Sequence, residues 1–301
     1  MKSHIYLPVL MLVLSACQPN TPAANGTQKV RISADSAQKA LKSEATVSAP
    51  PSLFLDADTL SQPMRELLAN HNLAELWQHY DTVGIYPDPT FKGYFGPDRY
   101  HFEMVFTRMK RDPHNPSVYH VTGKNWYPKS KNVRPFTGTL AVRQIVNLDY
   151  PGFLKTQASR GSDSLNYLAG KMYTARAQVQ LKEERAENSG LIEGEAIIDF
   201  FIIPEQKPGY VFVFQFEGFD DRLPTRGGEL IVRGNRRNVS TGEVKSFLVS
   251  PRLAAIAPHI FKDFMLDERM GQINPKYAKL GWNELWENDE WWADSPKPTL
   301  L

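Results

Sequence analysis

The sequence predicts a mainly β domain, built as an antiparallel meander of about eight strands with short helices before and after it. Hydrophobic residues make up 42% of the 301-residue chain and aromatic residues 11%, which is typical of a globular protein with a sizeable core. Between residues 85 and 249, apolar and polar residues alternate with a period of two, the pattern of half-buried strands. Short turns rich in Gly, Pro, Asn and Asp separate these runs, which favours antiparallel neighbours.

A helical segment, residues 53–84, is expected before the strands. Its apolar residues at three- and four-residue spacing are Met64, Leu67, Leu68, Leu73, Leu76, Trp77 and Tyr80. Thr59 or Ser61 can cap the helix, and Pro63 suits its first turn. Asn70-His71-Asn72 weakens the middle, so the pattern is compatible with one helix or with two short helices.

The β domain is expected over residues 85–249. The predicted strands cover residues 100–106, 118–122, 136–145, 173–181, 191–203, 210–217, 229–233 and 244–249. Residues 93–97, Gly-Tyr-Phe-Gly-Pro, are interpreted as a turn leading into the first strand. So many strands must pair their edges or hide them, and closure does this most simply. We therefore expect a lipocalin-like or similar antiparallel barrel, with a two-sheet sandwich as the alternative.

A second helical segment, residues 250–301, closes the chain. Ser250-Pro251 suits a helix start, and Pro258 should kink or divide the helix. Trp282, Trp286, Trp291 and Trp292 then gather within eleven residues, and the first two would share a helical face. They are predicted either to plug an open end of the barrel or to form a docking surface, with Trp282 and Trp286 as candidate binding residues.

The N-terminus carries a targeting signal. Lys2 is followed by the short apolar stretch Ile5–Leu14, which is too short to span a bilayer but has the pattern of a secretory signal. Leu14-Ser15-Ala16-Cys17 resembles the lipobox of bacterial lipoproteins. The resemblance implies that residues 1–16 are removed and that lipid is attached to Cys17, the only cysteine of the chain. By the same resemblance, Gln18 rather than Asp after that cysteine favours the outer membrane.

Residues 17–52 are expected to form a flexible tether behind the anchor. The segment is small, polar and interrupted by Pro and Gly, and it has too few large apolar residues to offset the entropy of ordering. As a coil of about 35 residues it would have an end-to-end distance of roughly 30 Å. A segment that folds on contact with a partner is the alternative.

No sequence motif points to catalysis, a cofactor or a metal. The chain has neither a Gly-x-Ser-x-Gly elbow nor a Gly-rich phosphate loop, so no catalytic residue and no cofactor are assigned. His101 and His120 could meet across a hairpin, but surface histidines explain them more simply and no metal site is assigned. One face of a predicted strand carries Glu193, Glu195 and Asp199. Two of these carboxylates could serve as the acid and base of a hydrolase, or the face could simply be exposed to solvent.

Basic residues gather in or beside predicted hairpin loops, and they are the candidate binding residues of the β domain. The later cluster consists of Arg233, Arg236, Arg237 and Lys245. The earlier cluster consists of Lys124, Lys129, Lys131 and Arg134. Such groups can bind anionic lipid headgroups or acidic glycan, or they can be ordinary solvated turns.

The sequence therefore predicts an outer-membrane lipoprotein that binds without catalysis. The expected partner is a lipid, an apolar small molecule or an envelope protein, in addition to the membrane reached through lipid on Cys17. A net charge of +2 gives no reason to expect nucleic acid. A structural lipoprotein acting through its surface is the first alternative, and a hydrolase using Glu193 and Glu195 is the second.

Overall fold

The computed structural model describes residues 60–78, 89–148, 172–184, 188–202, 211–213, 224–225, 227, 229–262, 273–284 and 290–293. All of them belong to one compact unit, Ala49–Leu301. The predicted signal peptide, Cys17, the tether and Trp286 lie outside the described residues. Within the described ranges, no helix combines the length and the apolar character needed to cross a membrane.

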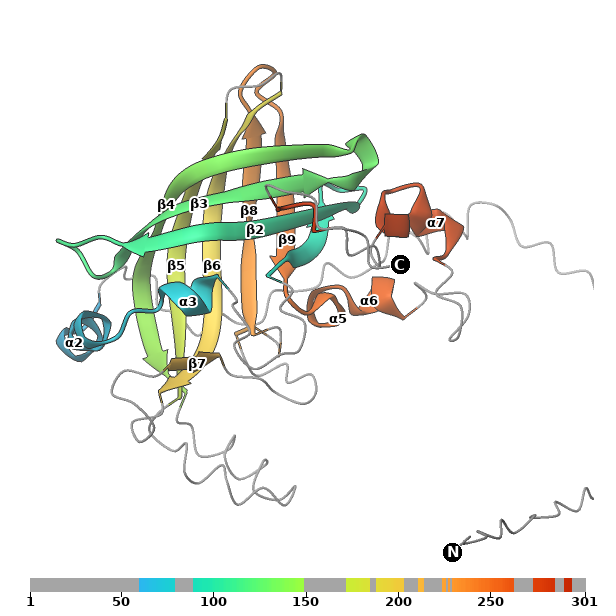
Figure 1. Cartoon of the computed structure of the whole chain (residues 1–301). Coiled ribbons are helices and arrows are strands. Elements are labelled where there is room, and N and C mark those ends of the chain that lie inside the picture. The colour runs from blue at the N-terminus through green and yellow to red at the C-terminus, as the bar shows by residue number, and fades with distance from the viewer. Residues whose placement is uncertain are drawn as a thin grey trace, which may run out of the picture. The chain divides into compact units, whose positions relative to one another are not determined.

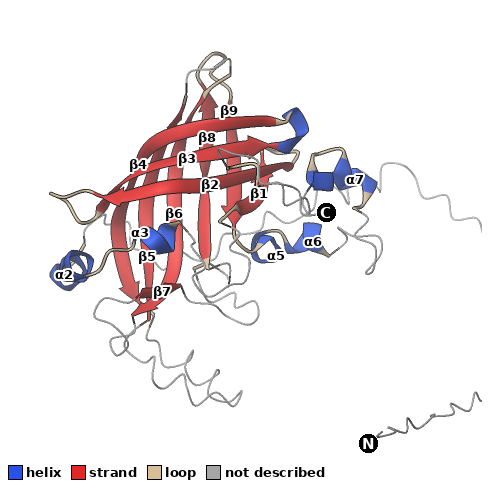
Figure 2. Ribbon diagram, in the orientation of Figure 1, coloured by secondary structure: helices blue, strands red, loops and turns tan. Residues whose placement is uncertain are grey.

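The domain is mainly β, as predicted, and eight of its strands pair in a closed antiparallel ring (Figure 2). The strands are β1 Phe91–Phe95, β2 Tyr100–Arg111, β3 Val118–Tyr127, β4 Asn132–Asn147, β5 Met172–Glu183, β6 Gly190–Ile202, β7 Val211–Val213, β8 Leu230–Asn238 and β9 Val244–Ser250. Chain neighbours pair in sequence, β8 lies beside β6, and β9 returns to β1. Of the described strands, only β7 lies outside the ring, paired with the end of β6. This closure matches the barrel prediction, because each sheet of a sandwich would keep two free edges.

Several predicted strands are longer in the structure, and glycine explains two of the boundary errors. Residues 93–97, predicted as a turn, begin with the last part of β1, the strand that closes the ring against β9. A Cβ at Gly93 would lie 1.9 Å from the Leu248 carbonyl oxygen, so glycine permits this close pairing rather than ending the strand. Similarly, β8 continues through Gly234 to Asn238, so Arg236 and Arg237 lie on a strand and not in a loop.

The interior of the ring is filled by apolar side chains that alternate along every strand. Aromatic rings of β2 contact rings of β1, β4 and β9: Phe106 lies 5.4 Å from Phe91 and 6.0 Å from Phe136, and Phe102 lies 5.7 Å from Phe247, between ring centroids. Buried interior residues of the other strands include Tyr119, Val121, Leu140, Val142, Ala175, Ala177, Val179, Leu181, Ile192, Ala196, Ile198, Phe200, Leu230, Val232 and Val249. The ring therefore encloses a packed core.

Two short helices, α2 Gln62–Asn70 and α3 Ala74–Trp77, contribute side chains to the same core. They take the two-helix form of the prediction, with the Asn72 Oδ1 accepting from the Ala74 amide at 3.2 Å where α3 begins. Trp77 is fully buried, and the Leu73 amide donates to the interior Tyr119 hydroxyl at 3.2 Å. The helices therefore cover the end of the ring at which the described chain enters it (Figure 1).

The C-terminal segment packs on the outside of the ring. It comprises α5 Leu253–Ile256, α6 Pro258–Phe261, α7 Pro275–Ala278 and the 3-10 helix η3 Trp282–Glu284 (Figure 1). As predicted, Pro258 divides the first helix. Trp282 is fully buried in a second apolar cluster with Ile231, Ile256 and Ile260. The prediction of an end plug is therefore wrong for Trp282, which covers the outer wall while α2 and α3 cover the end.

Candidate functional site

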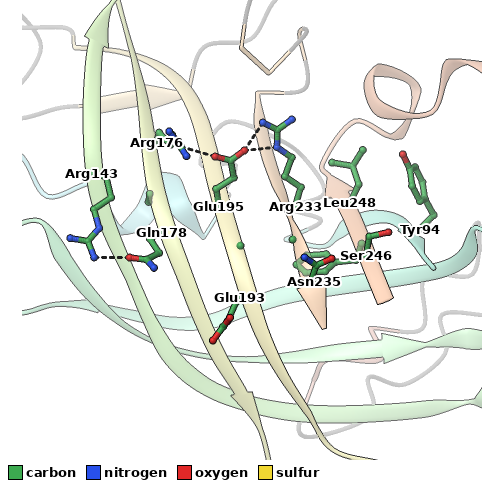
Figure 3. Close-up of a pocket in the computed structure, with 14 residues that line it drawn as sticks. Tyr94, Arg143, Arg176, Gln178, Glu193, Glu195, Arg233, Asn235, Ser246 and Leu248 are labelled. Carbon is green, nitrogen blue, oxygen red and sulfur yellow. Dashed lines mark hydrogen bonds and ion pairs between the residues drawn. The ribbon is translucent and has the colours of Figure 1, made fainter. Parts of the chain in front are cut away.

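A cavity of about 690 Å³ lies on the outer face of the ring, where the wet sides of several strands meet (Figure 3). We call it the outer groove. Its lining residues are Tyr94, Arg143, Arg176, Ala177, Gln178, Glu193, Gly194, Glu195, Arg233, Gly234, Asn235, Ser246, Phe247 and Leu248. They come from six strands, and most are polar, so the groove is a polar hollow on a curved sheet.

Two facing glycines shape the floor of the groove. Gly194 of β6 lies opposite Gly234 of β8 in the strand register. A Cβ on Gly194 would lie 2.1 Å from the Arg233 carbonyl oxygen, and a Cβ on Gly234 would lie 2.3 Å from the Glu193 carbonyl oxygen. The strands can approach and bend this closely only because both residues lack a side chain.

Glu195 forms the centre of an ion-pair network across three strands. Arg176 Nε donates to Glu195 Oε2 at 2.6 Å, and Arg233 Nε donates to Glu195 Oε1 at 2.5 Å (Figure 3). Both carboxylate oxygens are thus engaged by guanidinium groups. The network fixes two arginine side chains in the wall of the groove, where charge-assisted hydrogen bonds are the most directional contacts available.

Arg143 enters the groove from a β-bulge. The pairing of β4 with β5 shifts register between Val142 and Gln144, so Arg143 is the inserted residue. Bulges redirect side chains and are frequent beside functional sites. Arg143 Nη2 donates to Gln178 Oε1 at 2.6 Å, whereas its buried Nε has no hydrogen-bond partner among the described residues. A buried donor left unpaired is costly in a folded protein and calls for a partner.

Glu193, Asn235 and Ser246 supply polar groups to the middle of the groove. The strand registers place Glu193 beside Asn235 and Asn235 beside Ser246. All three residues are exposed, and no hydrogen bond joins their side chains to another described residue. Together with Arg143 and the amide of Gln178, they present both donors and acceptors. The arrangement can bind a polar ligand that carries an anionic group with hydroxyl or amine groups beside it.

Arg236, a predicted surface binding residue, points into the ring instead. Its Nη2 donates to Glu183 Oε2 at 2.7 Å, and the Asn125 amide and Tyr127 hydroxyl donate to the other oxygen at 3.0 and 2.7 Å. Burial raises the pKa of Glu183, but Arg236, Tyr127 and Asn125 outweigh it and the pKa is lowered. Burial beside Glu183 raises the pKa of Tyr127 well above its usual value. This network satisfies buried charges and is structural.

Asp199 is a second buried carboxyl group, on the outer side of β6. Thr174 Oγ1 donates to its Oδ1 at 2.5 Å, and the Thr225 hydroxyl and amide both donate to Oδ2. Burial raises the pKa of Asp199 to about 6, because these hydrogen bonds from neutral groups offset desolvation only in part. The sequence correctly predicts that Asp199 lies on the same strand face as Glu193 and Glu195. It does not predict that Asp199 is buried.

The remaining predicted residues are dispersed. In the β8–β9 register Arg237 lies opposite Val244, and Lys245 lies opposite Arg236. Lys245 Nζ lies 3.1 Å from Glu243 Oε1. His101 does not meet His120, which lies opposite Lys110 and 2.9 Å from Asp112. His101 stacks on Trp282 at 4.5 Å between ring centroids. Among the described residues no cluster of His, Cys, Asp and Glu has the geometry of a metal site.

The fold and groove define a class: a closed antiparallel β ring with a packed interior and a polar groove on its outer wall. No protein-family model, curated protein or solved structure matches the chain. The assignment of function therefore depends on the geometry of the outer groove. Sequence reasoning had named Arg233 and the face of Glu193 and Glu195, but it missed Arg143, Gln178 and Asn235. These residues could have been found from the strand face that they share with Glu193 and Glu195. Identifying that shared face requires the order in which the strands pair.

Proposed function

We propose that the protein is a non-catalytic binding lipoprotein of the bacterial envelope, and that it binds its ligand in the outer groove. The observation that carries the proposal is Arg143, which a bulge places in the groove and whose buried Nε has no hydrogen-bond partner within the described ranges. The expected ligand bears a carboxylate or phosphate that accepts from Arg143. Hydroxyl or amine groups beside this anion would contact Glu193 and Asn235.

The packed interior supports binding at the surface over transport inside the ring. A carrier for an apolar molecule needs an internal cavity of several hundred cubic ångströms. Here the described interior side chains of Phe91, Phe102, Phe106 and Phe136 are all at most 1% exposed, and they belong to one apolar cluster with buried side chains of every other strand of the ring. This packing does not support the prediction that the protein carries an apolar molecule. It supports the alternative that the protein acts through its surface.

The hydrolase alternative is weakened by the ion pairs of Glu195. A catalytic pair of carboxyl groups needs one member that can take up and release a proton. Both oxygens of Glu195 accept from arginines, so neither oxygen is free to contact a substrate. Glu193 faces the groove without such a partner, so it is better suited to binding a hydroxyl or amine group.

The anchor is the second part of the proposal. Lipid on Cys17 and the outer-membrane location follow from the lipobox resemblance and from Gln18. Two or more acyl chains would give lasting attachment, since each buried CH₂ contributes about 0.8 kcal/mol. Labelled palmitate should be incorporated by the chain and not by a Cys17→Ser variant, and that variant should leave the membrane fraction. Equal labelling of both would contradict the anchor.

Ligand binding can be tested with defined probes and native mass spectrometry. We expect glucuronate and glucose 6-phosphate to bind the full chain in calorimetric titration, and neutral glucose to bind less tightly. Replacing Arg143→Gln should weaken binding of both anionic probes roughly tenfold, because a hydrogen bond to a charged group contributes about 1.5–3 kcal/mol. Native mass spectrometry of gently purified protein should reveal an anionic ligand that is absent from this variant.

Arg108→Gln provides the matched control, because Arg108 is an exposed arginine of β2 that does not line the groove. It should bind the probes as the unchanged chain does. Equal affinity for glucose and the anions, or equal affinity of the two variants, would overturn the outer groove as the binding site.

A further inference from the structure

The exposed large hydrophobic residues of the described chain gather at one end of the ring. They are Val133, Leu191, Val239 and Val244, between 38% and 58% exposed. All of them lie beside the turns that join β3 to β4, β5 to β6 and β8 to β9. Single exposed aliphatic residues are ordinary, but a group at one rim indicates a contact surface.

Three of these residues lie in or beside a row that alternates with cations. The strand registers pair Lys182 with Leu191, Leu191 with Arg237, and Arg237 with Val244, across β5, β6, β8 and β9. We call these four residues the rim row. Directly opposed side chains lie about 5 Å apart in antiparallel sheets, so the row is a continuous surface. Val239 extends it at the tip of the β8–β9 hairpin, which projects from the ring (Figure 1).

The row borders a small hollow that is lined by one cation and one carboxylate. A cavity of about 210 Å³ is lined by Leu191, Glu193, Asn235, Arg237 and Val244. Arg237 and Lys182 are exposed, and no ion pair engages either one among the described residues. The same three turns also carry the exposed cations Lys129 and Lys131. Their exposed carboxylates are Glu184 and Glu243, and Glu243 forms an ion pair with Lys245. Among the described residues, the rim is therefore net positive as well as partly apolar.

We propose that the rim row and Val239 form a site for an anionic lipid surface. Arg237 and Lys182 would contact lipid phosphates, while Leu191, Val244 and Val239 would reach the boundary between headgroups and acyl chains. This combination distinguishes a membrane from a soluble polyanion, because a polyanion would engage the cations and leave the aliphatic side chains in water. The site uses other cations than the proposed ligand site in the neighbouring outer groove, and it does not depend on the lipid anchor.

Vesicle binding by the full chain carrying Cys17→Ser, which removes the acylated residue, tests the proposal. We expect binding to phosphatidylcholine vesicles that contain phosphatidylglycerol, and much weaker binding to phosphatidylcholine alone. The double substitution Lys182→Gln and Arg237→Gln should weaken binding roughly tenfold to thirtyfold, since each cation near an anionic membrane contributes about 1 kcal/mol. Raising NaCl from about 0.05 M to about 0.5 M should weaken it as well, by screening.

The matched control is Arg108→Gln with Lys110→Gln, two exposed cations of β2 outside the rim. It should bind as the parent chain does, and so the uncleaved N-terminus, common to all variants, cannot produce the difference. Val239→Thr with Val244→Thr should weaken vesicle binding without changing charge, and circular dichroism should show that every variant is folded. Equal binding by rim and control variants would overturn the proposal. The proposal would also be overturned if the valine double variant bound vesicles normally and soluble polyglutamate competed fully with them. That result would identify a site for polyanions.

Discussion

Replacing Asp199→Asn should stabilise the protein above about pH 6 and remove part of its pH dependence. In the folded state burial raises the pKa of Asp199 to about 6, against a usual value of 3.8. The difference of about two pKa units corresponds to about 3 kcal/mol. Because the folded pKa is raised, this contribution to stability is fully present below about pH 4 and is lost as pH rises through 6.

The asparagine variant cannot ionise, so it keeps its stability where the aspartate loses it. Its amide has nearly the shape of a protonated carboxyl group, and the Thr174 and Thr225 hydroxyls can each donate or accept. Urea unfolding followed by tryptophan fluorescence would give the free energy of unfolding of both proteins from about pH 4 to about pH 8. The variant should gain about 3 kcal/mol relative to the parent across this range.

Comparing the two proteins at each pH removes the contributions of other groups, such as Asp112, whose pKa is lowered to about 2 by hydrogen bonds from His120 and from backbone amides. Glu193→Gln, which changes an exposed carboxylate on the same strand, is the matched control. A constant difference between parent and Asp199→Asn at all pH values would refute the reasoning, as would a growing advantage of the parent at high pH.

Three further substitutions test the packing of the ring, each by urea unfolding. Arg236→Met should cost about 3–5 kcal/mol because it leaves the buried Glu183 carboxylate without its cation, and adding Glu183→Leu should recover most of that loss; no recovery would contradict the pairing. Gly194→Ala should cost about 1–3 kcal/mol because its Cβ would lie 2.1 Å from a backbone carbonyl of β8, and a neutral result would contradict the close approach. Trp291→Phe should cost about 1–3 kcal/mol because the indole N–H donates at 2.7 Å to Glu103, a buried carboxylate; unchanged stability would mean that this contact is not formed in solution.

Most strands could be predicted from the sequence because one face of each is dry and the other wet, which produces the period of two. The first strand could not, because Phe91–Phe95 contains a glycine that pairing requires and is followed by Gly96-Pro97, which resemble turn residues. The predicted strand 210–217 has the right composition, but its described part, β7, lies beside β6 outside the ring. Composition alone therefore does not determine which strands close a ring.

The side on which each charge lies was predictable only in part. Arg236 belongs to the series Val232, Gly234, Arg236 along β8, which faces the interior, and the alternation could have shown this. A stretch of Gly, Asn and Arg nevertheless has the composition of a loop, and its strand conformation depends on pairing with β6 and β9. The outer groove could not be predicted from the sequence, because its walls come from strands that are distant in sequence and meet only through the ring order.

The outer groove and the rim row are neighbouring surfaces of one face. Glu193 and Asn235 line both the groove and the hollow beside Arg237, so a ligand in the groove would lie next to any membrane that the rim contacts. With both proposals, the groove would face molecules at or near the lipid headgroups, where anionic and hydroxyl-bearing groups are concentrated. The two sites still use different cations, Arg143 in one and Arg237 with Lys182 in the other. Arg143→Gln should therefore leave vesicle binding intact, and the rim variant should bind soluble glucuronate as the parent does, which separates the two functions experimentally.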